Sequence, residues 1–253
     1  MATDSPPMYT DTPLAAIHTP EFETGKKNPF TLEASKMVIS HNSFIRGFNS
    51  IYQQAPRVPP ADKLDFAQYA IAWHDCMEAH HRYEEDDFFP NVDKAAGKSG
   101  LMDFAVHEHA AFHDGLERFK TYLVKEGGSF SASELIAIMD SFKDPLHSHL
   151  KAEPPAIAAL AKYDTPEHPI DIVAIADRAA KNSISLSAVF NVFPVFFLNM
   201  DTATFEGGMW DGVFPPLNGT GKWLMTKAVP MWHSSRWRFT SCSPEGKFKQ
   251  LAV

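Results

Sequence analysis

The stretch HDCMEAHHRYEEDDFFP, from His74 to Pro90, combines three histidines and a run of four acids with apolar residues. Ionised carboxylates are rarely buried unless they are paired or bind a metal. His80 and Glu84 are four residues apart, so on a helix both side chains lie on the same face. A histidine and a carboxylate on an apolar helical face indicate half of a metal site.

Histidine is the most informative residue in the composition, with 12 copies among 253 residues. Neutral imidazole binds transition metals, so an excess of histidine beside acids points to metal chemistry. The hydrophobic content of 44% is ample for a globular core. A formal net charge of -8, without a lysine or arginine run, argues against nucleic acid or an anionic membrane as the main partner.

The ends and the cysteines predict a cytoplasmic location. The first 22 residues lack the basic region and apolar run of a secretory signal. The two cysteines, Cys76 and Cys242, make no disulfide framework, which fits a reducing compartment. The longest apolar run, residues 185–198, is too short to span a bilayer and contains Asn191 and Pro194.

The sequence predicts an all-α fold in three parts. Residues 1–30 form an arm that lies on the surface or is partly disordered, and residues 31–163 hold four helices. Residues 164–253 form an aromatic-rich, partly irregular extension that packs on those helices, with a fifth helix from about Ile170 to Asn191.

Each of the four helices carries metal-binding side chains on its apolar stripe. These residues are His41 on the first helix, His80 and Glu84 on the second, His109 and His113 on the third, and His149 and Glu153 on the fourth. His81 and Glu85 form a neighbouring pair on a stripe of lighter residues, so this pair ranks second. His107 and His147 fall off the stripes.

Five imidazoles and two carboxylates form a dinuclear ligand set, in which the carboxylates bridge two ions and the imidazoles fill terminal positions. Donors of nitrogen and oxygen without thiolate suit iron, with manganese or zinc as alternatives. The alternative for a single inward histidine is a hydrogen-bonded core residue, and for Glu85, Asp86 and Asp87 it is a solvated acidic face. If none of the seven residues bound a metal, several polar side chains would be buried without partners, which is costly.

Four strings, HNSFIRGF, HHRYEEDDFFP, HEHAAFHDGLERF and HSHLKAEPPAI, resemble the ligand segments of the hemerythrin-like family, also called HHE cation-binding domains, over residues 31–163. The resemblance implies an up-and-down four-helix bundle with an oxo- or hydroxo-bridged pair of iron ions, held by the same seven residues. Pro154 departs from the family, because it replaces an acid and disfavours helical geometry at Glu153. Residues 164–253 have no counterpart in the family's small oxygen carriers.

Two functions follow from this interpretation. The first is an oxidoreductase that binds dioxygen or peroxide and oxidises a small organic substrate, with residues 193–237 covering the mouth of the bundle. The second is a protein that binds or senses oxygen, nitric oxide or iron without catalysis. A third interpretation is a bundle without metal, in which the histidines are structural.

Several further side chains are expected around the metals. An apolar lining that excludes water from the metals is expected from Phe44, Trp73, Met77, Phe112 and Phe142. Candidates for proton delivery or for holding the ligands are His74, Tyr69 and Cys76, with packing favoured for the last two. In the extension, Trp210, Trp223, Trp232 and Trp237 with His233, Arg236 and Arg238 form either a substrate lid or, by preference, aromatic packing onto the bundle.

Overall fold

A computed structural model describes residues 5–253, so the first four residues of the predicted arm lie outside the described part. Helices dominate this part of the chain, and it contains two isolated β-bridges but no strand. The prediction of an all-α fold is confirmed. Within residues 5–253, no helix combines the length and the apolar character that crossing a membrane requires.

The α-helices are α1 (Pro20–Thr24), α2 (Pro29–Gln54), α3 (Lys63–Tyr83), α4 (Phe89–Ala96), α5 (Asp103–Glu126), α6 (Ala132–Ala159), α7 (Ile172–Asn182), α8 (Leu186–Asn191), α9 (Phe193–Phe197), α10 (Gly219–Trp223) and α11 (Ser234–Trp237). Short 3₁₀ turns span Ala55–Arg57, Pro60–Asp62, Gly127–Ser129, Leu160–Tyr163, Phe205–Gly208 and Val229–Met231. Two π-helical turns span Glu84–Phe88 and Leu224–Ala228.

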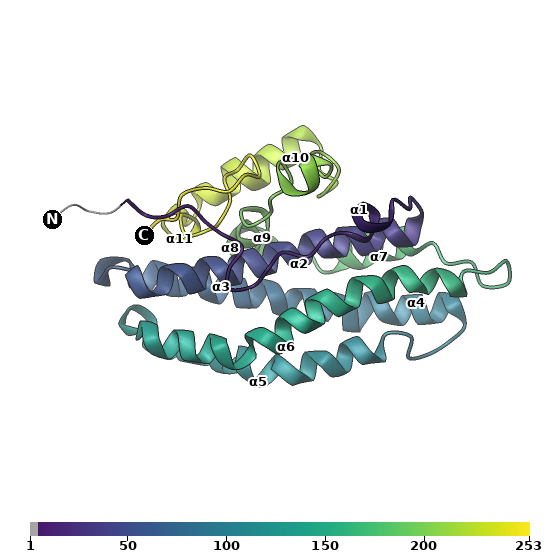
Figure 1. The fold of residues 1–253 in the computed structure, drawn as a ribbon, viewed down its shortest axis with the longest axis horizontal. Helices are drawn as coiled ribbons and strands as arrows, with labels where there is room; N and C mark the ends of the chain where they lie inside the picture. The colour runs from purple at the N-terminus through teal and green to yellow at the C-terminus, as the bar shows by residue number, and fades with distance from the viewer. Residues whose placement is uncertain (1–4) are drawn as a thin grey trace.

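Four long helices lie side by side in Figure 1. Helix α2 packs on α6, α6 on α5, α5 on α3, and α3 on α2, so the four form a closed ring. Gly115 allows α5 to approach α6 closely, because a Cβ atom there would lie 2.5 Å from the Cβ atom of Phe142. Helix α6 begins after the cap residue Ser131, whose side chain accepts a hydrogen bond from the backbone N–H of Glu134.

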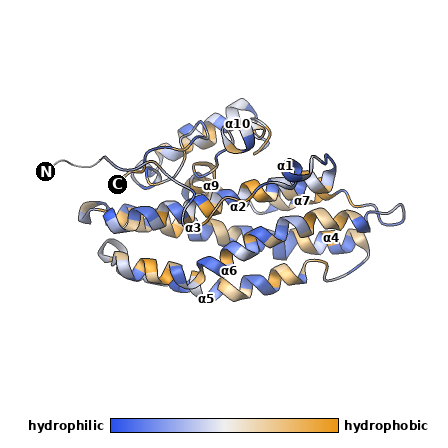
Figure 2. Cartoon of the chain, in the orientation of Figure 1, coloured by the Kyte–Doolittle hydropathy of each residue, from blue (hydrophilic) through white to orange (hydrophobic). Residues whose placement is uncertain are grey.

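Amphipathic spacing explains why these helices turn one face inward. The buried residues of α5 recur at steps of four and three: Ala105, His109, Phe112, Leu116, Phe119 and Leu123. Hydrophobic and hydrophilic residues accordingly alternate along the long helices in Figure 2. The inward faces build one main core, and a second core forms around α4 and α7.

The helical segment that carries His80 and Glu84 contains a π-helical turn. The turn Glu84–Phe88 joins α3 to α4, and α4 ends before Gly97, which has a positive φ of 62°. A π-helical turn accommodates one extra residue and is frequent at functional sites. Phe88 and Phe89, which follow the inserted residue, are both buried.

Helix α6 continues through Pro145, Pro154 and Pro155. A proline removes one backbone hydrogen bond and bends a helix, and α6 bends part-way along its length in Figure 1. Pro154 does not turn Glu153 away from the core, since Glu153 is completely buried.

The extension and the arm share the core of the four helices. Trp237 and Phe239 belong to the main core, and Phe239 meets Phe66 edge to face with a centroid distance of 5.1 Å. The backbone N–H of Tyr9 in the arm donates to the carbonyl of Lys249 near the other end of the chain. Boundaries at residues 30 and 163 therefore stay a prediction.

Candidate metal centre

Two groups of metal-ligating side chains meet inside the four helices. Cluster A contains His41, His80, Glu84 and Glu153, and cluster B contains His81, His109 and His149. Within each cluster, one ligand atom of every residue lies within 4.8 Å of the others. The clusters take residues from α2, α3, α5, α6 and the π-helical turn, so the packing of the helices brings the donors together.

The carboxylate of Glu84, a member of cluster A, also lies near a histidine of cluster B. Its Oε1 atom is 2.9 Å from Nε2 of His80, and its Oε2 atom is 3.5 Å from Nε2 of His109. Neither oxygen has a hydrogen-bond partner, although both are buried. A buried carboxylate without a hydrogen bond is costly, so Glu84 is suited to a cation on each side.

The carboxylate of Glu153 likewise lies near one histidine of each cluster. Its Oε2 atom lies 3.2 Å from Nε2 of His41 and 3.8 Å from Nε2 of His149. Both carboxylate oxygens are buried without a hydrogen-bond partner. Glu84 and Glu153, both of cluster A, therefore each lie near one histidine of cluster A and one of cluster B.

Hydrogen bonds orient two rings of cluster B. The Nδ1–H of His109 donates to Glu85, and the Nδ1–H of His149 donates to Oε2 of Glu108 at 3.2 Å. Because ionised carboxylates only accept hydrogen bonds, each ring carries a proton on Nδ1, and in the neutral rings both Nε2 atoms present lone pairs. These two Nε2 atoms are 3.1 Å apart. A cation between them removes the repulsion of the lone pairs.

Cluster A repeats this arrangement. The Nδ1–H of His41 donates to the carbonyl of Leu150 at 2.7 Å, which directs Nε2 of His41 toward Nε2 of His80, 3.1 Å away. Two nitrogens bound to one ion at about 2.1 Å and at a right angle would be about 3.0 Å apart. The spacing of the nitrogens in both clusters therefore fits metal coordination. In cluster B, His81 adds a third imidazole, whose buried Nε2 atom has no hydrogen-bond partner.

The pKa shifts favour neutral imidazoles. Burial lowers the pKa of His80 and of His81 well below 6.5, and neighbouring histidines lower it further. Burial and the neighbouring His109 and His41 lower the pKa of His149 to about 2. Burial, followed by the neighbouring Glu153, raises the pKa of Glu84 well above 4.5. Neutral imidazole is the form that binds a metal, and a cation would replace the proton on Glu84.

The structure brings together six of the seven predicted ligands: His41, His80, Glu84, His109, His149 and Glu153. It does not bring in His113, whose side chain is 58% exposed and lies 3.6 Å from Asp114. The expectation that His113 faces the core is wrong, because the steps of α5 place Phe112 at that inward position. His81 supplies the fifth imidazole in its place. Binding of metal by these residues stays a prediction.

Two carboxylates outside the clusters, Glu85 and Glu108, hold histidine rings of cluster B. Glu85 was assigned to a solvated acidic face, and Glu108 was not considered, yet they accept from His109 and His149. The pair His81 and Glu85, ranked second, contributes one residue to cluster B and one to its surroundings. The sequence signal for this contribution was the four-residue spacing that His81 and Glu85 share with His80 and Glu84.

The three residues expected to surround the metals, His74, Tyr69 and Cys76, belong to neither cluster. Tyr69 is buried, and its hydroxyl lies 3.2 Å from Nδ2 of Asn199, which donates to it. Cys76 is buried, and burial raises the pKa of its thiol to about 12. His74 joins a separate group with Glu78 and Glu117.

Apolar rings cover the clusters as expected. Phe44 lies 4.9 Å from the ring of His80, and Phe112 lies 5.5 Å from the ring of His149. The remaining residues of the predicted wall belong to the main core: Trp73, Met77 and Phe142. His107 is exposed, and the ring of His147 donates from Nε2 to the carbonyl of Ala15.

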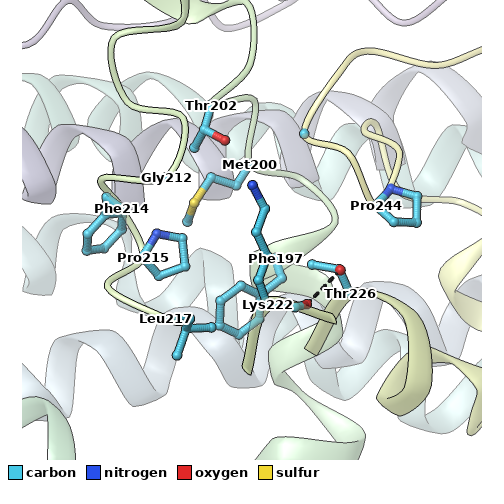
Figure 3. Close-up of a pocket in the computed structure, with 11 residues that line it drawn as sticks. Phe197, Met200, Thr202, Gly212, Phe214, Pro215, Leu217, Lys222, Thr226 and Pro244 are labelled. Carbon is cyan, nitrogen blue, oxygen red and sulfur yellow. Dashed lines mark hydrogen bonds between the residues drawn. The ribbon is translucent and has the colours of Figure 1, made fainter. Parts of the chain in front are cut away.

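A pocket lies within the extension (Figure 3). Its wall includes Phe197, Met200 and Phe214, and the Lys222 side chain also lines it. The neighbouring ring of Phe196 lies 5.8 Å from Phe44, which contacts His80, so two aromatic rings separate the pocket wall from cluster A.

The tryptophans of the extension divide into two kinds. Trp210 and Trp237 are buried, as packing requires, whereas Trp223 and Trp232 are exposed. His233, one of the residues of the predicted lid, belongs to neither cluster and precedes α11 with a left-handed φ of 60°.

All-helical architecture with buried groups of histidine and carboxylate defines a cation-binding class of protein. The chain belongs to the hemerythrin HHE cation-binding domain family, whose family model matches residues 34–154. A relative, the "Dimeric xanthone biosynthesis cluster protein R11" of Cryptosporiopsis sp. (strain 8999), is 33% identical over 224 residues, which cover 86% of this chain and 81% of the relative. No solved structure matches the chain.

Proposed function

We propose that this chain is an up-and-down four-helix bundle with a dinuclear, non-haem iron centre that activates dioxygen or peroxide and oxidises a small organic substrate. The observation that carries the proposal is the approach of two imidazole Nε2 atoms to 3.1 Å in cluster B, beside buried carboxylates that have no hydrogen-bond partner. In this proposal, the carboxylates of Glu84 and Glu153 and the histidines of clusters A and B would hold the two ions. An iron pair, when bound, supplies two-electron exchange with the oxidant.

The residues of the chain have distinct tasks in this proposal. Imidazole Nε2 atoms hold the ions, and Glu85 and Glu108 fix the tautomer and the orientation of His109 and His149. Seven side chains cannot fill every position of two six-coordinate ions, even with both carboxylates bridging, so room remains for a small oxidant. Phe44 excludes water on the side of cluster A.

The substrate part of the proposal is supported by the extension. Its pocket has a largely apolar wall and lies two rings from cluster A, and its cavity volume of about 30 Å³ would have to widen to admit an aromatic ring. The relative that spans most of this chain carries xanthone biosynthesis in its name. A xanthone is a planar aromatic compound, so we propose an aromatic substrate for this chain.

A non-catalytic function is the second candidate: binding or sensing of oxygen, nitric oxide or iron. The burial of the clusters favours it, because His41, Glu84, His149 and Glu153 are completely buried. Such a site admits a diatomic gas more easily than an organic molecule.

Iron analysis and spectroscopy test the proposal. Iron-loaded full-length protein should contain about two irons per chain and change its absorption spectrum on exposure to oxygen or peroxide. Glu84→Gln should lose iron, whereas Asp86→Asn, in the same π-helical turn, should keep it. Consumption of oxidant with an aromatic substrate supports the enzyme, and a stable, reversible oxygen adduct supports the binding protein. Absence of iron after reconstitution contradicts both.

A further inference from the structure

A third group of side chains lies on α3 and α5 and shares no residue with clusters A and B. We propose that this group, cluster C, binds a divalent transition-metal ion through His74, Glu78 and Glu117 as a separate mononuclear site. One ligand atom of each residue lies within 4.8 Å of the others. His74 is two helical turns before His81, which separates them by about 10 Å along α3.

The strongest indication is the unpartnered nitrogen of His74. The side chain is 0% exposed, and its Nε2 atom has no hydrogen-bond partner. This nitrogen faces Oε1 of Glu117 at 3.7 Å. A buried imidazole nitrogen directed at a carboxylate needs either a cation between them or a proton of its own.

The other nitrogen of His74 also faces a carboxylate. The Nδ1–H of His74 donates to Oδ1 of Asp75 at 3.3 Å. In a neutral ring that donates through Nδ1, the other nitrogen carries the lone pair, and a carboxylate behind the ring is the common arrangement at metal-binding histidines. Nε2 of His74 is therefore available to an ion that Glu117 also reaches.

The charges around cluster C also favour a cation. Asp75 is paired with Lys120, whose Nζ atom is 2.8 Å from Oδ1 of Asp75. Among residues 5–253, no lysine or arginine forms an ion pair with Glu78 or Glu117. A divalent ion would neutralise these two carboxylates.

The donor set determines which ions fit. Glu78 follows His74 by four residues on α3, so both side chains project from one face toward Glu117 on α5. The Glu117 side chain is 48% exposed, so the site opens to solvent and can take water as a fourth ligand. One imidazole, two carboxylates and water suit a tetrahedral zinc ion, or iron or manganese at higher coordination.

Zinc binding by the full-length protein tests the site. Protein stripped with a chelator is saturated with zinc chloride, freed of excess zinc and analysed for metal. We expect Glu117→Gln and Glu78→Gln each to bind one zinc fewer per chain than the wild type. The test compares the zinc content of each variant with that of the wild type, so a loss of one ion is expected whether the wild type binds three ions or only the ion of cluster C. The total zinc content of the wild type reports separately on clusters A and B.

Two further variants and a second measurement complete the test. Asp114→Asn, one turn before Glu117 and fully exposed, removes the same charge and should leave the zinc content unchanged. Asp75→Asn should weaken zinc binding by about tenfold to a hundredfold, because the ring of His74 loses its orientation. Nitrogen-15 NMR should show the Nε2 resonance of His74 shifting on addition of zinc. Equal zinc in the wild type and Glu117→Gln, or a doubly protonated His74 in excess zinc, would overturn the proposal.

Discussion

The Nε2 atom of His109 lies 3.1 Å from the Nε2 atom of His149, and both rings donate through Nδ1 to carboxylates. Each Nε2 atom therefore presents a lone pair to the other. In a protein core this arrangement is repulsive without a cation. The two outer carboxylates thus prepare the inner nitrogens for metal before any ion arrives.

Replacement of His81 and of His113 distinguishes two ligand sets. We expect His81→Ala to lower the iron content well below two per chain, because cluster B loses a nitrogen that faces its centre. His113→Ala should keep the wild-type content, since that side chain is exposed. Metal analysis of the two variants after identical reconstitution provides the measurement. Loss of iron in His113→Ala alone would restore the set expected from the sequence.

Removal of the outer carboxylates should weaken metal binding without abolishing it. Glu85→Gln and Glu108→Gln remove the acceptors that orient His109 and His149. Loss of such partners typically costs about tenfold to a hundredfold in metal affinity. Competition with a chromophoric chelator measures the affinity, and Asp86→Asn serves as the matched control. Wild-type affinity in both variants would show that the rings are oriented by packing alone.

The buried histidines should make the metal-free protein sensitive to acid. The pKa of His149 is lowered from 6.5 to about 2, and the pKa values of His80 and His81 are also lowered. Below pH 6.5 the unfolded chain takes up protons that the folded chain does not, so the free energy of unfolding falls as the pH falls. Each such histidine contributes up to about 1.4 kcal/mol per pH unit.

Glu84 changes the free energy of unfolding with pH in the opposite direction to the histidines, so its carboxyl group must be removed for this measurement. Glu84 has a raised pKa, so its contribution to stability decreases as the pH rises. Urea unfolding of metal-free Glu84→Gln between pH 7.5 and pH 5.5 should therefore show a clear loss of stability toward acid. A flat profile would indicate that water reaches the clusters.

Metal binding should release protons from Glu84. Its raised pKa means that the folded, metal-free protein keeps this proton at a higher pH than an ordinary glutamate does. A cation displaces the proton, while the neutral histidines have none to release. Calorimetric titration with zinc at pH 6, in two buffers with different ionisation heats, counts the released protons. Glu84→Gln should release fewer protons, and an equal number would assign the release to other groups.

The two kinds of tryptophan should differ in their contribution to stability. Trp237 is buried in the main core, so Trp237→Ala should cost about 3 to 5 kcal/mol in the free energy of unfolding. Trp223 is 59% exposed, so Trp223→Ala should change it by no more than about 0.5 kcal/mol. Denaturant unfolding of the full-length variants compares them. Equal and small effects would mean that the extension is a separate unit.

The sequence predicted the helices well because their apolar residues recur at helical steps. It failed at His113 for a physical reason: residues three and four positions after His109 are both near the same face, and only the packing of α5 against its neighbours selects Phe112. Burial of both His80 and His81 also depends on packing, because α3 contacts α2 on one side and α5 on the other.

The outer residues were harder to predict than the ligands. Glu85 lies among four consecutive acids, where solvation is the ordinary expectation. Its contact with His109 joins two helices, and no spacing within one helix reveals it. The effect of Pro154 also required coordinates, since a proline disfavours helical geometry in the preceding residue but does not forbid it.

The π-helical turn Glu84–Phe88 affects how this chain can change in length during evolution. An insertion or a deletion in an ordinary helix rotates every later residue by about 100° and would expose a buried face. Here the extra residue is already absorbed between His81 and Phe88, so its removal would return the turn to regular helix with the downstream faces preserved. The acidic run is thus the place where this helix can lose a residue and keep both its histidines and its phenylalanines facing inward.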